Sequence, residues 1–136
     1  MDMGHGLHNM NFDVASRVLD QGLFPDTLST DGHRLCREGP VDDLPTTVAK
    51  LMAVGFSLPQ VVHMATSRAA SLLGHSEEMG ALVVGRTADI SILRLEDREW
   101  QAVDSQRGTI QARQALVPVL TIRNGIPYDP FPAQQP

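Results

Sequence analysis

The spacing of apolar residues predicts two amphipathic helices in the first half of the chain. One is expected over residues 12–19, with Asn11 as its N-cap. The other is expected over residues 44–56, closed by Gly55.

Two short strands are expected ahead of these helices, at residues 1–6 and 26–30. Strand followed by helix is the order of βα units in a parallel sheet. Two parallel strands cannot cover both of their own faces, so the first half is predicted to be an incomplete sheet.

Two further helices are predicted from capping signals. Ser57 and Gln60 stand at the spacing of a capping box, which opens a third helix. Thr66 and Ser67 are expected to cap a short fourth helix that ends at Gly74.

After Gly80 the pattern changes to that of strands. Residues 88–95 and 116–122 alternate or run apolar, and Asn124-Gly125 is a hairpin turn signal. The segment from residue 126 to the end is rich in proline and cannot pair as a central strand. It is expected to be extended or disordered.

Composition excludes several function classes. The 136 residues carry 11 Lys and Arg against 16 Asp and Glu, a formal net charge of −5, with no basic cluster. This argues against binding of nucleic acid. The single Cys36 cannot form an internal disulfide, and there is neither a signal-peptide pattern nor an apolar run of about 18 residues. A cytoplasmic protein without membrane contact is predicted.

Asp31 is the first candidate for chemistry, because it directly follows a short strand and precedes a long loop. Sheets of α/β proteins place catalytic groups at this position. A carboxylate here could ligate a divalent metal and shuttle a proton. The alternative is that Asp31 only caps the following turn.

Other candidates flank this aspartate. His5 and Gly6 lie in a Gly-His-Gly segment that lets the backbone approach a ligand, and His8 follows at a metal-ligand spacing. A flexible chain start is the alternative. Arg34, in the loop predicted over residues 32–43, could bind a substrate carboxylate or be a solvated charge.

Several motifs together resemble the C-terminal third of the amidohydrolase superfamily, nearest its dihydroorotase-like deacetylases, which remove acyl groups from amino acids or their esters. The motifs are residues 1–6, 11–12, 25–33 and 39–47. Residues 80–90 are similar to the segment by which these enzymes return to a small β-sandwich, and residues 119–125 resemble its closing strand.

The resemblance implies an α/β fold made of a partial (β/α)8 TIM barrel, its last two βα units, followed by part of a small β-sandwich. Residues 1–75 would belong to the barrel, 76–126 to the sandwich and 127–136 to a Pro-rich tail. Residues 2–6 would be barrel strand seven and residues 27–31 strand eight.

The resemblance also implies a reaction, the hydrolysis of an acyl-amino or cyclic amide C–N bond with a divalent metal, foremost zinc. Asp31 matches the strand-eight aspartate that contacts the metal and acts as general acid and base. His5 and Gly6 match positions near the substrate, and His33 and Arg34 lie in the loop over the active site.

The family's metal-binding histidines on the first, fifth and sixth strands and its lysine on the fourth have no counterpart here. The chain is therefore expected to be a fragment or truncated form, inactive alone and without tightly bound metal. It would associate with itself or with a chain that supplies the missing strands.

Two alternatives remain open. One is a noncatalytic module that covers its open barrel edge by self-association. The other is a small metal-binding protein that uses four side chains, His5, His8, Asp31 and His33.

Overall fold

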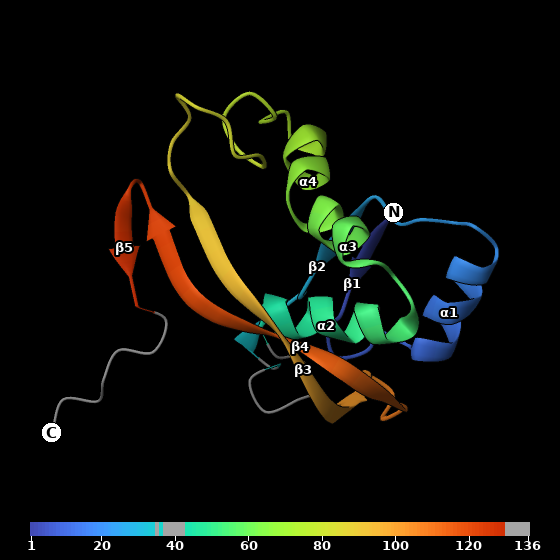
Figure 1. The fold of residues 1–136 in the computed structure, drawn as a ribbon. Coiled ribbons are helices and arrows are strands. Elements are labelled where there is room, and N and C mark those ends of the chain that lie inside the picture. The colour runs from blue at the N-terminus through green and yellow to red at the C-terminus, as the bar shows by residue number, and fades with distance from the viewer. Residues whose placement is uncertain (35, 37–42, 130–136) are drawn as a thin grey trace, which may run out of the picture.

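Two separate sheets pack against α2 (Leu44–Val54) in the computed structural model, which describes residues 1–34, 36 and 43–129 (Figure 1). Strands β1 (Asp2–Gly4) and β2 (Thr27–Ser29) form a parallel pair. The prediction of two strands at these positions is confirmed. Among the described residues, no helix has the length and apolar character needed to cross a bilayer.

The four predicted helices are confirmed, namely α1 (Phe12–Asp20), α2, α3 (Leu58–Ala65) and α4 (Ser67–Leu72). The first turns of α1 and α3 are fixed by local signals. The Asn11 side chain accepts a hydrogen bond from the Val14 amide at 2.9 Å, and Gln60 accepts one from the Ser57 amide at 2.8 Å in the predicted capping box.

Thr66 is the N-cap residue of α4, as predicted, but its side chain does not cap the helix. Its hydroxyl donates instead to the carbonyl of Val62 at 2.6 Å, one turn back in α3, and no side-chain cap is formed. A threonine that follows a helix directly can satisfy the last turn of that helix, and its oxygen is then aimed away from the next one.

The second sheet is a long antiparallel hairpin of β3 (Ile90–Val103) and β4 (Thr109–Arg123), with β5 (Ile126–Tyr128) at its edge. The prediction of strands over 88–95 and 116–122 was correct in place and too short in extent. The missed parts carry charged residues and two buried alanines, Ala102 and Ala112, whose small side chains give a weak apolar signal.

The turn between β4 and β5 confirms the expected hairpin signal. Asn124 and Gly125 have φ angles of 50° and 76°, as a two-residue turn of type I′ requires. Strand β5, which contains Pro127, pairs with β4 and, among the described residues, with no other strand. Residues 126–128 are thus extended and do not form a central strand, as predicted, whereas residues 130–136 of the predicted segment lie outside the described residues.

The core lies where α2 and α3 meet the parallel strands and the end of the hairpin that carries the β3–β4 turn. It is built mainly of aliphatic and Met side chains. Its buried members are Met10, Phe12, Leu28, Val48, Leu51, Phe56, Val61, Met64, Ala102 and Ala112. The opposite end of the hairpin, next to β5, projects from this core (Figure 1). Ile92, Leu93 and Val119 are exposed there.

Asp26, just before β2, ties the strand to α4. Its carboxylate accepts hydrogen bonds from the Met1 amino group at 2.6 Å and from Arg68 Nε at 3.1 Å. These two bonds lower the pKa of Asp26 to about 2.

Candidate functional site

The candidate site lies where the two parallel strands end. The strand ladder continues past them, because the His5 amide donates to the Ser29 carbonyl at 3.1 Å and the Gly6 amide to the Thr30 carbonyl at 3.0 Å. The loop from residue 5 to residue 11, here called the β1–α1 loop, therefore starts beside Asp31.

Asp31 is exposed and has a φ of 47°, in the left-handed region that few residues other than glycine adopt. Its Oδ2 accepts a hydrogen bond from Asn9 Nδ2 at 2.5 Å. Among the described residues, the following turn is bonded instead by Thr30, whose Oγ1 accepts from the Gly32 amide at 3.3 Å. The carboxylate thus points to the β1–α1 loop, and within the described part of the chain its Oδ1 makes no hydrogen bond.

Gly6 makes room for this contact. It has a φ of +48°, and a Cβ placed on it would lie 2.6 Å from Asp31 Oδ2 and 2.8 Å from Asn9 Nδ2. The Gly-His-Gly segment was predicted to let the backbone approach a ligand. In the structure, the backbone of Gly6 is approached by the Asp31 carboxylate.

His5 is fully buried. Its Nδ1 lies 3.2 Å from the carbonyl of Gly6, and its Nε2 lies 3.0 Å from Nζ of Lys50 in α2. Because a carbonyl can only accept, the proton is assigned to Nδ1, and Nε2 accepts from Lys50.

His5 and Asp31 lie on opposite faces of the parallel pair. Side chains alternate along a strand, so His5 follows Met3 onto the face that packs into the core. A Cβ on Gly4 would lie 3.2 Å from Asp31 Cβ, which places Asp31 on the other face. The structure does not bring the His5 imidazole to the carboxylate.

His33 and Arg34 are exposed and follow Asp31 after Gly32, and His8 is exposed in the β1–α1 loop. The rest of the predicted loop, residues 35 and 37–42, lies outside the described residues.

A metal centre needs more ligands than this site offers. Within the part of the chain that the structure describes, no three His, Cys, Asp or Glu side chains come together. The four side chains of the metal-binding alternative are therefore not gathered into one group. Structural and catalytic zinc sites take three or four protein ligands, so these residues alone do not fit a zinc ion.

Sequence reasoning missed four polar residues around the β1–α1 loop, namely Asn9, Lys50, Asp104 and Ser105. Lys50 is the only lysine of the sequence and is 2% exposed. A charged residue within the apolar run of a predicted helix was the one available signal, since lysine is rarely buried without a partner. The other three are polar residues of loops and turns, which carried no such signal.

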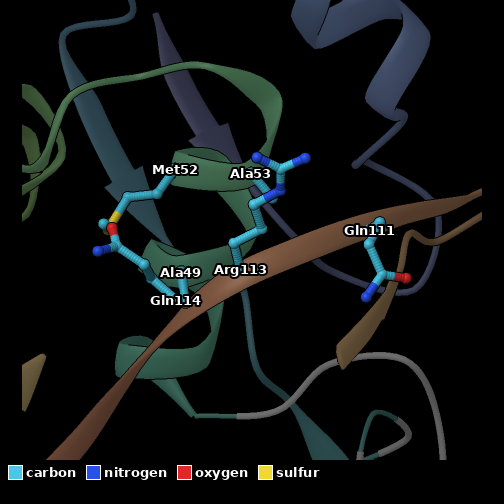
Figure 2. Close-up of a pocket in the computed structure, with 6 residues that line it drawn as sticks. All are labelled: Ala49, Met52, Ala53, Gln111, Arg113 and Gln114. Carbon is cyan, nitrogen blue, oxygen red and sulfur yellow. The ribbon is translucent and has the colours of Figure 1, made fainter. Parts of the chain in front are cut away.

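A surface pocket lies elsewhere, between α2 and β4 (Figure 2). Its volume is about 220 Å³, and it is lined by Ala49, Met52, Ala53, Gln111, Arg113 and Gln114. It contains none of the residues predicted to form the site.

Known proteins are similar to this chain in sequence and in fold. Residues 9–125 match the amidohydrolase family. A deacetylase of Enterococcus faecalis is 36% identical over 129 residues, which are 94% of this chain and 35% of that protein. The chain thus spans about a third of the relatives it matches.

Solved structures of similar fold are also covered only in part by this chain. The crystal structure of an adenine deaminase superposes with a TM-score of 0.89 at 36% identity, over 94% of this chain and 35% of that one. That of a dihydroorotase superposes with a TM-score of 0.86 at 31% identity, over 94% of this chain and 34% of that one.

Proposed function

This chain belongs to the amidohydrolase family, and from that membership we propose that it forms the C-terminal part of a hydrolase that cleaves an acyl-amino or cyclic amide C–N bond. Asp31 is the acid and base group of that reaction. The observation that carries the proposal is the exposed carboxylate at the end of β2, held by Asn9 and by an uncommon backbone conformation.

In this proposal β1 and β2 are the last two strands of an eight-stranded barrel, within residues 1–75. The sheet face away from the core supports this, because the Asp2 carboxylate there accepts hydrogen bonds from Thr27 at 2.6 Å and from Ser29 at 2.7 Å. Such a polar face would line a barrel interior. The hairpin within residues 76–126 would be part of a β-sandwich, and residues 127–136 its tail.

Asp31 would move one proton in the reaction. Its Oδ1 would take the proton from the attacking water and later pass it to the leaving nitrogen, while Oδ2 stays bonded to Asn9. The family is generally metal-dependent, and zinc is the ion we expect. Asp31 is the one ligand proposed in this chain, and the others would come from the part of the fold that it does not span.

Substrate contacts are proposed for the exposed residues after Asp31. The charged Arg34 would pair with a substrate carboxylate, and His33 would donate or accept a hydrogen bond. The buried His5 and Gly6 would act on the substrate site by shaping the β1–α1 loop.

A chimera tests the proposed function. This chain replaces the aligned segment of the Enterococcus faecalis deacetylase, and the product is assayed on acetylated amino acids, their esters and cyclic amides. We expect hydrolysis by the chimera, and no turnover by the isolated chain, with zinc content far below one ion per molecule. A chimera that folds by circular dichroism yet hydrolyses none of these compounds would contradict the proposal, as would stoichiometric zinc in the isolated chain.

Self-association is a second candidate, favoured by the open sheet. Among the described residues, β1 and β2 pair only with each other. Exposed apolar side chains also lie at the end of the hairpin next to β5. Unpaired strand edges are templates for pairing. We expect light scattering of the isolated chain at micromolar concentration to give a mass above 14.8 kDa. A uniform monomer would argue against a self-associating module.

A further inference from the structure

The turn between β3 and β4, residues 104–108, contacts the β1–α1 loop from far along the chain. The Ser105 amide donates to the Met10 carbonyl at 3.1 Å, and the Met10 amide donates back to Ser105 Oγ at 3.2 Å. The same hydroxyl lies 2.8 Å from the His5 carbonyl and 2.9 Å from that of Gly6. One serine thus joins both ends of the loop.

Asp104 fixes this turn and the start of α1 together. Its buried carboxylate accepts from the Phe12 amide at 3.0 Å, the Gln106 amide at 2.8 Å and the Gly108 amide at 2.7 Å. The Phe12 amide is one of the first in α1, which have no partner inside the helix. The carboxylate supplies that partner and holds the end of the loop.

Lys50 supports the loop from the other side. It reaches from α2 to Nε2 of His5 inside the core, at 3.0 Å. The loop is therefore fixed at His5, Gly6, Met10 and Phe12, and Asn9 lies between these fixed points. The Asn9 side-chain amide donates a hydrogen bond to the Asp31 carboxylate at 2.5 Å.

We propose that the 104–108 turn is a positioning element for Asp31, which acts by fixing the β1–α1 loop so that Asn9 holds the carboxylate. Ser105 is its principal positioning residue. A catalytic role for this positioning rests on the proposed function, because both concern the Asp31 carboxylate. The contact chain runs from Ser105 through Gly6 and Met10 to Asn9 and then to Asp31.

The side-chain amide protons of Asn9 report this coupling by NMR of the 136-residue chain. With one proton bonded to a carboxylate, the two resonances are expected to be widely separated. Asn124, exposed in the β4–β5 turn, gives the reference for a solvated amide, and Asp31→Ala gives the Asn9 value without the bond.

In Ser105→Ala we expect the Asn9 separation to collapse toward the Asp31→Ala value. Ser105→Thr, which keeps the hydroxyl, should restore it, and Ser71→Ala on the exposed surface of α4 should not change it. If Ser105→Ala does not fold, Ser105→Cys weakens the same bonds and gives the same readout. An Asn9 separation unchanged in a variant with a lowered melting temperature would overturn the proposal, because the turn would then only stabilise the fold. The readout needs no turnover, so an inactive chimera and a failed coupling are distinguishable.

Discussion

Asp31→Asn is expected to lower the kcat of the chimeric deacetylase by about 10³-fold, the middle of the range for losing a general acid and base. Asparagine has nearly the same shape, and its carbonyl oxygen can still accept the hydrogen bond from Asn9. It also tolerates the left-handed backbone that Asp31 adopts. The substitution therefore removes the carboxylate, and with it proton transfer and the proposed charged metal ligand, while the loop geometry remains.

The measurement is kcat and KM at neutral pH, with circular dichroism and melting temperature on the same samples. Asp20→Asn is the matched control, since Asp20 is an exposed carboxylate at the end of α1, away from the candidate site. The control should keep its full activity. Activity of the Asp31 variant close to that of the parent would refute the proton-transfer role.

Local signals explain why most of the fold could be predicted. A cap such as Asn11, a capping box such as Ser57 with Gln60, and the Asn124-Gly125 turn all act within a few residues of themselves. The helices and the turn followed from these patterns. The halves of β3 and β4 next to their shared turn were not predicted. Their buried residues include the small Ala102 and Ala112, and charged residues face outward.

The candidate site was predictable only in part, for a related reason. Asp31 and Gly6 carry their signals locally, as a carboxylate after a strand and a glycine in a tight loop. The partners that hold them come from distant positions, since Ser105 is 100 residues from His5 and Lys50 is 45. A sequence pattern gives no register for such contacts, so the support of the site emerged only with the fold.

The length of the chain has a structural consequence as well. A 136-residue sequence is long enough for one domain. Among the described residues the core nevertheless covers one face of β1 and β2 and not the other, which carries the hydrogen-bonded Asp2, Thr27 and Ser29. The relatives span about three times this length. In the proposed barrel, the face that holds Asp31 is the face that the rest of the fold would enclose.

Gly6→Ala is expected to lower both the free energy of unfolding of the chain and the kcat of the chimera, because the added methyl group displaces the Asp31 carboxylate. Alanine at a φ of +48° costs about 1–2 kcal/mol in the left-handed region. Its Cβ would also lie 2.6 Å from Asp31 Oδ2, so the exposed carboxylate must move away from Asn9, and the loss of a typical hydrogen bond costs about 0.5–1.5 kcal/mol. The free energy of unfolding should fall by about 2.5 kcal/mol, and the kcat of the chimera by at least about tenfold.

Gly22→Ala is the control that separates backbone conformation from contact. Gly22 has a φ of +71°, and a Cβ placed there meets nothing within 4 Å. The free energy of unfolding of this variant should fall only by the conformational cost, about 1–2 kcal/mol, and its activity should be kept. Urea unfolding of the isolated chain and kcat of the chimera measure the two effects. Equal losses in the two glycine variants would mean that Gly6 serves only the shape of the loop, whereas a larger loss at Gly6 in both assays ties that glycine to the position of the Asp31 carboxylate.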